Sequence, residues 1–520
     1  MTSDNRYYRK VVCLIGVALL IRCILAFTVN LGNDEAYYFT YAIQPDWNHF
    51  DHPPLVGIFI RIFTLDLHWI NDLSMRLTSI VAAALCTWII FQCGCVIKNE
   101  RAGWIASILY NVSVYTSIIS GLFIIPDSPQ LVFWLLTVLI ALKLLLATQT
   151  KKQQSIRIML IGACIGLATM CKIHGLFLWF GIGIYILLYD RRYLKNPFLY
   201  LSFMVTLAII SPIFLWNLQN HFITWRFHSQ RVEIHHVLLN PSSFVTALAG
   251  QILYNNPVNI IIYVIALPGL KKTRFPQGPL HLLRWFSFPI IIVVTAISLF
   301  RNVLPHWSGP GFIGLMLISS VVWDEYFTAG KARYCKRWLA AGGIFTATLI
   351  VLGVACVDLY PGTLGNKRAE KLGAGDVTLD MYGWRELSKD FKLIRQDDVR
   401  NGLMPKTAPI VINKWFPGGH LLYYVGYPLH VPVIGVGDLD DLHKFAWLNR
   451  AQGMLTKGEN AYYITSSHYF KDPKIQYAGD FNRIVLIKKI AQMRSGFTAR
   501  YWYIYRLEGA VRKLGDILPE

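Results

Sequence analysis

The sequence predicts a polytopic α-helical membrane protein that ends in a soluble α/β domain. Of its 520 residues, 54% are hydrophobic and only 15% are charged, whereas soluble domains carry roughly 25% charged residues. Apolar segments close to membrane-spanning length recur through the first two thirds of the chain. These two observations exclude a disordered chain and an ordinary soluble protein. The net charge of +20 must be divided by region before it can indicate a partner.

Eleven membrane crossings are expected within residues 1–357, the predicted transmembrane domain. The first apolar segment follows a basic start and lacks a small-residue cleavage site, so we interpret it as a retained span and not as a signal peptide. The fifth and sixth segments are the shortest, which suits tilted or partly buried helices. The segments lie at residues 11–28, 73–96, 103–120, 130–147, 159–171, 176–189, 198–216, 244–268, 285–300, 310–325 and 338–357.

Lysine and arginine positions predict the orientation. With a cytoplasmic N-terminus, the connections on the cytoplasmic side hold 19 basic residues and the opposite loops hold six. Positive charge is retained on the cytoplasmic side of a membrane. We therefore expect outer loops at residues 29–72 and 217–243, and an outer C-terminal domain at residues 358–520.

This C-terminal segment is long enough to form its own core. Apolar runs at residues 408–413, 431–436, 461–466 and 483–487, with a helical stretch at 419–425, predict a small α/β domain. All nine cysteines occur by Cys356, so a disulfide-stapled outer domain is excluded. The sequence contains neither a zinc-like cysteine spacing nor a nucleotide-binding motif. No metal, cofactor or nucleic-acid partner is predicted.

Two adjacent carboxylates, Asp34 and Glu35, follow the first span and precede Tyr37 and Tyr38. A general base with an orienting partner beside aromatic rings suits a sugar-binding surface. The alternative is that Asp34 caps a short helix and Glu35 is a solvated charge in its first turn. Taken alone, the pair favours this structural interpretation.

The same loop continues with His49, Asp51 and His52 before Pro53 and Pro54. Two imidazoles and a carboxylate at a proline-fixed turn can bind a phosphate or, less readily, a divalent metal. A proline-stopped loop with incidental polar residues is the alternative.

Three further charges stand out near or within the spans. Asp127 lies in an outer loop just before the fourth span, where an N-cap is the simpler interpretation. Lys172 lies in a very short outer turn, where it can meet a lipid phosphate or extend to the headgroups. Arg22 lies inside the first span and is expected to be paired within the bundle.

A longer polar cluster follows the seventh span and includes Trp216, Asn217, Arg226 and Arg231. Planar rings, amides and guanidinium groups can stack on sugars, bond hydroxyls and clamp a phosphate. An aromatic belt accounts for the tryptophans but poorly for the amides and arginines. His306 belongs to a late outer loop of similar composition, for which a kinked connection is the alternative.

The order and sidedness of these motifs resemble the bacterial GT-C membrane glycosyltransferases, in particular the protein O-mannosyltransferase-like enzymes and the lipid A aminoarabinose transferases. The resemblance covers most of residues 1–330. It rests on Asp34-Glu35, Pro53-Pro54-Leu55, Pro126-Asp127-Ser128-Pro129, Lys172, Trp216-Asn217 with Trp225, and Pro305-His306-Trp307.

The resemblance implies an inverting transfer of a sugar from a polyprenyl-phosphate donor on the periplasmic face of the bacterial inner membrane. No nucleotide would be used there, and the acceptor would be lipid A, lipopolysaccharide or another envelope lipid or glycan. A protein O-glycosyltransferase of the same fold is an alternative. A flippase for lipid-linked sugars and a scaffold with a sensory tail are alternatives of other classes, but polar clusters on one face favour an enzyme.

The resemblance also implies roles for individual residues. Asp34 would deprotonate the acceptor with help from Glu35, and Asp127 would be a second acidic site residue. The donor-phosphate contacts would be His52 and Lys172, with Arg226 or Arg231 as a further clamp. The residues expected at the substrate are Tyr37, Tyr38, His49, Trp216, Asn217 and His306.

Two departures make aminoarabinose a doubtful donor. Tyr37 stands where the aminoarabinose enzymes have an arginine, and His52 stands where they have a lysine. Some distant GT-C relatives use a divalent cation, but lysine, histidine and arginine can neutralise the phosphate here. We therefore expect activity without a metal.

Overall fold

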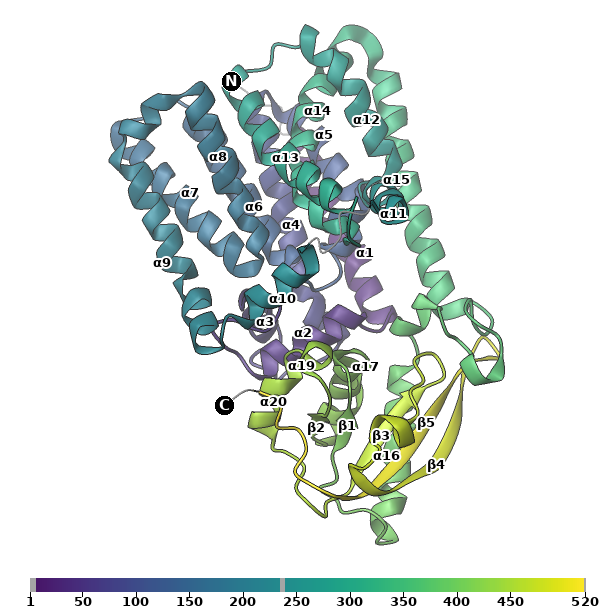
Figure 1. Ribbon diagram of the computed structural model, residues 1–520. Coiled ribbons are helices and arrows are strands. Elements are labelled where there is room, and N and C mark those ends of the chain that lie inside the picture. Colours follow the sequence, from purple (N-terminus) through teal and green to yellow (C-terminus); the bar gives the residue numbers. More distant parts are fainter. Residues whose placement is uncertain (1–5, 234–238, 519–520) are drawn as a thin grey trace. The chain divides into compact units, whose positions relative to one another are not determined.

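The computed structural model describes residues 6–233 and 239–518, with the side chains of residues 231 and 232 left undescribed (Figure 1). The chain forms two compact units. The membrane unit comprises Met1–Leu25, Trp47–Phe59 and Leu73–Leu349. The sheet unit comprises Ala26–Asp46, Ile60–Asp72 and Ile350–Glu520. The first loop of the chain is therefore divided between the two units.

Long apolar helices make up most of the membrane unit. Their starts follow ordinary capping rules: Thr150 accepts the N–H of Gln153 before α7, and Asn196 accepts the N–H of Phe198 before α9. The helices are α1 (Arg6–Thr28), α3 (Leu55–Phe63), α4 (Asp72–Ile97), α5 (Glu100–Val112), α6 (Asp127–Leu146), α7 (Lys151–Cys171), α8 (Leu176–Tyr189), α9 (Pro197–Gln219), α10 (Ile223–Val232), α11 (Pro241–Tyr254), α12 (Pro257–Gly269), α13 (Gln277–Ile297), α14 (Phe312–Tyr326) and α15 (Ala332–Val354).

Seven helical stretches of the described residues are long and apolar enough to cross a membrane. The pair α11 and α12, bent by 89°, makes an eighth when counted as one broken span. Two of the expected crossings, at 103–120 and 176–189, correspond to the shorter helices α5 and α8. The chain is a multi-pass membrane protein, and the orientation of its N-terminus stays a prediction.

The helices α14 and α15 are joined by a reversal at Gly330, which has a φ of 80°. The rings of Trp323 and Tyr334 stack with their centroids 5.8 Å apart. Eleven residues of straight helix would rise by about 16 Å, so the chain turns back between the two residues that carry these rings. Figure 1 shows the ribbon of α14 and α15.

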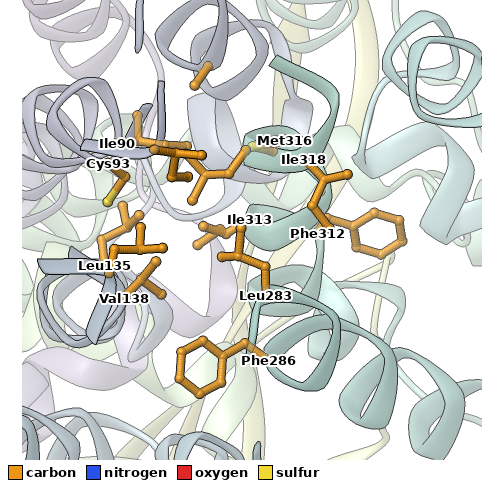
Figure 2. Close-up of a cluster of buried hydrophobic side chains, with 14 of the residues drawn as sticks. Ile90, Cys93, Leu135, Val138, Leu283, Phe286, Phe312, Ile313, Met316 and Ile318 are labelled. Carbon is orange, nitrogen blue, oxygen red and sulfur yellow. The ribbon is translucent and has the colours of Figure 1, made fainter. Parts of the chain in front are cut away.

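The core of the membrane unit is apolar and continuous across its helices. Figure 2 shows Ile90, Leu135, Leu283, Ile313 and Met316 converging from α4, α6, α13 and α14. All five side chains are fully buried. The expected pairing of Arg22 inside this unit is confirmed, because its buried guanidinium donates to the carbonyl of Ser117 over 3.1 Å.

The sheet unit contains a mixed five-stranded sheet in the order β2-β1-β3-β5-β4 (Figure 1). β1 is parallel to β2 and β3, whereas β5 is antiparallel to β3 and β4. The sequence predicted the first four strands but gave no signal for β5. The strands are β1 (Ile410–Ile412), β2 (Val433–Gly435), β3 (Ala461–Ser466), β4 (Phe481–Arg494) and β5 (Phe497–Ala510).

The helix α2, from the first loop of the chain, packs in the sheet unit against α17. Gly419 permits this approach, because a Cβ there would lie 2.9 Å from the backbone nitrogen of Tyr37. His420 Nε2 and the carbonyl of Leu31 lie 2.8 Å apart, and this hydrogen bond joins the end of α17 to the segment before α2. The helices of this unit are α2 (Asn33–Ile43), α16 (Trp384–Arg400), α17 (Trp415–His420), α18 (Tyr427–Leu429), α19 (Leu439–Leu442), α20 (Phe445–Gln452) and α21 (Pro473–Gln476).

Candidate functional site

A buried ion pair lies at one end of the helices of the membrane unit. The Lys172 ammonium donates to Asp127 Oδ2 over 2.7 Å, and the two side chains are only 4% and 2% exposed. The Tyr115 hydroxyl donates to Asp127 Oδ1 over 2.9 Å. Both oxygens of the carboxylate are therefore engaged, one by a cation and one by a neutral donor.

This arrangement corrects the capping interpretation of Asp127. The N-cap position of α6 is Pro126, and Asp127 is the first residue of the helix. The Asp127 side chain bonds to Lys172 and Tyr115 in place of the first-turn N–H groups. Pro126 has no side-chain acceptor, so no side chain caps the start of α6. The sequence interpretation of Asp127 as the N-cap is therefore wrong.

Local backbone geometry presents each member of the pair. α7 ends at Cys171, and Lys172 takes an extended conformation with φ −155° and ψ 136°. Its carbonyl accepts a hydrogen bond from Gln130 Nε2 over 2.7 Å. Tyr115 begins the π-helix η1 (Tyr115–Ile119), a local widening that is frequent at functional sites.

The 3₁₀-helix η5 (Pro305–Gly311) packs against Tyr115. A Cβ at Gly309 would lie 2.3 Å from the Tyr115 ring, so only glycine permits this contact. The same 3₁₀-helix carries His306 and Trp307, and the ring centroids of Trp307 and His174 are 6.3 Å apart. The structure thus brings the predicted His306 into the neighbourhood of the ion pair.

The imidazoles of His52, His174 and His306 all lie within electrostatic range of Asp127 and Lys172. Burial lowers the pKa of His52 to about 3, so this imidazole is neutral at physiological pH. Neutral imidazoles donate and accept hydrogen bonds without competing with Lys172 for the charge of Asp127. The predicted residues His52, Asp127, Lys172 and His306 therefore form one cluster in the membrane unit.

The loop that carries His52 is held by α10. The Asn48 side chain donates to Thr224 Oγ1 over 3.0 Å, and Thr224 in turn donates to the carbonyl of His49 over 3.0 Å. His228 Nε2 lies 2.7 Å from the carbonyl of Asp51. His49, a predicted substrate contact, is buried in this loop.

Sequence reasoning did not select Thr224 or His228, although both lie in the cluster that supplied Arg226. The ring centroids of His228 and His52 are 6.0 Å apart. His228 lies on α10, two residues after Arg226, in the polar segment that the sequence had already singled out. The arginines of the same segment were selected as phosphate contacts in its place.

The other predicted residues of this segment have different surroundings. Trp216 and Asn217 are buried at the end of α9, where the Asn217 side chain donates to the carbonyl of Ile213 over 2.9 Å. Arg226 is exposed on α10, and its guanidinium makes no hydrogen bond or ion pair among the described residues. The side chain of Arg231 lies outside the described part of the chain.

In the sheet unit, Glu35 and not Asp34 completes the start of α2. Glu35 is buried, and its Oε2 accepts the backbone N–H of Gly32 over 2.8 Å. The expectation that Asp34 caps the helix while Glu35 is solvated is therefore wrong. Asp34 is exposed in the first turn of α2, where the helix dipole stabilises a carboxylate.

Asp380 is an acidic residue beside α2 that sequence reasoning missed. Its Oδ2 accepts a hydrogen bond from Asn33 Nδ2 over 2.9 Å, and its Oδ1 accepts one from the Tyr469 hydroxyl over 2.6 Å. Burial raises the pKa of Asp380. A single aspartate in a polar stretch carries no sequence signal, because only the fold brings Asn33 and Tyr469 to it.

Tyr37 and Tyr38 are buried in the aromatic interior around α2. The ring of Tyr37 meets that of Trp415 edge-on at 5.4 Å. Its hydroxyl accepts the backbone N–H of Lys444 over 3.3 Å. Within the described residues, no group of three or more His, Cys, Asp or Glu side chains is arranged to hold a metal ion.

Comparison with solved structures identifies the fold of the chain. Two crystal structures of ArnT from Cupriavidus metallidurans superpose on the chain, one in the apo state with a TM-score of 0.61 and one bound to undecaprenyl phosphate with a TM-score of 0.65. The chain has the GT-C fold. The two structures are 14% and 15% identical to it, cover 95% and 96% of it, and have 97% and 98% of their own chains covered.

Residues 51–216 of this GT-C chain match the family model for the dolichyl-phosphate-mannose-protein mannosyltransferases. No curated protein sequence matches the chain significantly. The matched segment contains His52, Asp127 and Lys172 but not Asp34. Sequence similarity to this family is therefore found where the buried ion pair lies.

Proposed function

We propose that this GT-C chain is an inverting glycosyltransferase that moves a sugar from a polyprenyl-phosphate donor to an envelope acceptor on the periplasmic face of the bacterial inner membrane. The observation that carries the proposal is the buried pair of Asp127 and Lys172 among three histidines. A site of this kind suits a phosphate that becomes more negative as its sugar leaves.

Lys172 is the proposed partner of the departing phosphate. An ammonium has three N–H donors, and Asp127 accepts only one of them. The other two are available to phosphate oxygens, and His52 and His306 can add neutral donors. Asp127 then acts as a positioning residue for Lys172, since both of its oxygens already accept hydrogen bonds.

An apolar groove supports a lipid-linked donor, and the ring of Phe177 in its wall stacks on His174 with the centroids 6.4 Å apart. The groove has a volume of about 780 Å³ and lies between α8 and α13. Leu176 and Phe177 line one end, close in sequence to Lys172, and Trp285 and Ile292 line the facing helix. An isoprenoid chain is apolar along its length and suits such a wall. The undecaprenyl phosphate bound in one of the two ArnT structures is a lipid of this class.

Asp34 is the proposed base that takes the proton of the acceptor hydroxyl. A single inversion needs one base, unlike the acid and base pair of a hydrolase. Asp34 is exposed, and Glu35 fixes the start of α2 beneath it through the bond to Gly32. Glu35 therefore supports Asp34 as a positioning residue.

Lipid A, lipopolysaccharide or another envelope glycan is the proposed acceptor, by analogy with the ArnT fold. A protein acceptor is the second candidate, because residues 51–216 match a family of protein mannosyltransferases. A flippase would move the intact lipid-linked sugar and would need no base.

The test is transfer of label from polyprenyl-phosphate sugars to separated envelope lipids, glycans and proteins by the reconstituted chain. Asp34→Asn is compared with Asp397→Asn, which removes an exposed carboxylate from α16 of the same unit. We expect the wild type and Asp397→Asn to label one envelope fraction and Asp34→Asn to label it about 100-fold more slowly. Movement of the intact lipid across the bilayer without transfer by any variant would replace the enzyme with a flippase.

A further inference from the structure

The tip of the β4–β5 hairpin is bound to the end of the last membrane helix. Ser495 and Gly496 form the turn with φ values of 47° and 82°, as in the sharp two-residue turns of β-hairpins. The Ser495 hydroxyl donates to the carbonyl of Leu359 over 2.8 Å. Leu359 ends a helical stretch that is long and apolar enough to cross a membrane.

Arg494 fixes this contact by capping the helix. Its buried guanidinium donates to the carbonyls of Cys356 and Val357 over 3.2 Å each, and its Nε donates to Gly362 over 2.8 Å. The carbonyls at a helix C-terminus lack partners within the helix, and a cation there is favourable. An ion pair of 2.9 Å with Asp376 balances the charge of Arg494. The hairpin tip is therefore held at the C-terminal end of this helical stretch.

Large apolar side chains at this place are exposed. The exposed fractions are 67% for Leu359, 48% for Leu364, 46% for Met493 and 62% for Phe497. Soluble surfaces seldom gather several such side chains without a partner. Val351 and Leu352, further back on the helix, are exposed in the same way, so the apolar surface of the helix continues onto the hairpin tip.

Basic side chains border this apolar group. Lys367, Arg368 and Lys371 are exposed in the segment between Leu364 and Asp376. The backbone N–H of Leu364 donates to Asp376, the partner of Arg494, so this segment is tied to the hairpin tip. Basic residues next to a span attract anionic lipid headgroups. An apolar group with a basic border is typical of a segment that lies in the membrane interface.

We propose that Leu359, Leu364, Met493 and Phe497 form an interfacial anchor, which inserts into the lipid leaflet at the end of the last span. Lys367, Arg368 and Lys371 contact the lipid phosphates around it. The occupant of this surface is the bilayer, because the surface continues a helix that is itself surrounded by lipid. The anchor holds the β4–β5 end of the sheet unit at the membrane surface, and it is independent of the proposed transfer reaction.

An environment-sensitive fluorescent amino acid at position 497 tests the anchor in the full chain reconstituted into vesicles. Some of the lipids carry bromine near the top of the acyl chains, which quenches a fluorophore in contact with them. We expect quenching of about twofold at position 497. A matched probe at the exposed Ile475 should stay unquenched, because it lies before the opposite end of β4, about 40 Å along the hairpin.

A probe at Val351, on the helix itself, reports correct insertion. Quenching at 351 but not at 497 would overturn the proposal. Blue-shifted but unquenched emission at 497 would overturn it too, because a second copy or another protein would then cover the tip. Reversal of all three charges, K367E, R368E and K371E, should abolish any increase in quenching that phosphatidylglycerol produces over phosphatidylcholine alone. An increase that survives the reversal would reject the proposed role of the basic border.

Discussion

Lys172→Met separates the structural part of the buried pair from its part in catalysis. The substitution removes the cation and leaves the Asp127 carboxylate buried, with only Tyr115 as a donor. One-sided removal of a buried ion pair costs about 3–5 kcal/mol. We expect the substitution to lower the free energy of unfolding by about 3 kcal/mol. This is the lower end of the range, because the hydrogen bond from Tyr115 to Asp127 remains. Titration with denaturing detergent in mixed micelles measures this value.

The double variant Asp127→Asn with Lys172→Met removes both charges. Asparagine keeps an oxygen for the Tyr115 hydroxyl, so no buried charge is left without a partner. Replacement of a whole buried pair is often neutral, and we expect the double variant to recover about 2–3 kcal/mol of the lost stability. The recovered stability is the measured coupling between the two side chains.

Transfer activity should not recover with stability. Loss of one donor to a developing negative charge lowers kcat by roughly 100- to 1,000-fold, and the single and double variants both lack the ammonium. Lys98→Met is the control, because Lys98 pairs with Asp324 over 3.1 Å and with Glu325 over 2.5 Å elsewhere in the membrane unit. Recovery of kcat in the double variant would refute the role of Lys172 at the phosphate and leave it a purely structural partner of Asp127.

Three further predictions concern the base, the sheet unit and metals. Asp34→Asn should lower kcat by about 100-fold and change the free energy of unfolding by less than about 0.5 kcal/mol. Glu35→Ala should lower the free energy of chemical unfolding by about 1 kcal/mol, because the bond that caps α2 is lost. Equal stability of the two variants would contradict the capping role of Glu35. Burial holds the pKa of His420 at about 3. Between that value and its unfolded pKa of about 6.5 the unfolded state binds the extra proton, so the sheet unit should lose about 2 kcal/mol on acidification to pH 5. His420→Phe, which keeps a ring against Trp384, should flatten this pH dependence, and an unchanged slope would assign it to another group. Transfer should persist in EDTA, and a full loss that Mg²⁺ or Mn²⁺ reverses would show that a metal is required.

The fold class could be predicted from the sequence because it follows from local patterns. Apolar segments mark membrane helices wherever they fall, and short apolar runs marked β1 to β3 and part of β4. β5 was not predicted because charged and aromatic residues interrupt its apolar pattern, as at Arg500 and Arg506. β5 pairs with β3 and β4 in the folded sheet, and strand propensity depends strongly on such neighbouring strands.

The site was only partly predictable, for two reasons. Asp127 and Lys172 are 45 residues apart, and their contact depends on how α6 packs against α7. Tyr115 is a partner of Asp127 through its side-chain hydroxyl, and a tyrosine in an apolar segment carries no sequence signal for such a contact. For Asp34 and Glu35 the start of the helix decides the roles. Gly32 is the N-cap of α2, so Glu35 is the third helical residue and bonds back to Gly32, whereas Asp34 is exposed.

The division of the first loop between the two units explains why neighbouring motifs need separate tests. Asp34 belongs to the sheet unit and His52 to the membrane unit, although only 18 positions separate them. The family match begins at residue 51, so it includes His52 and Lys172 but not Asp34. A loss of activity in Lys172→Met therefore leaves the base unassigned, and a loss in Asp34→Asn leaves the phosphate contact unassigned. Only the two variants together can establish both halves of the proposed transfer.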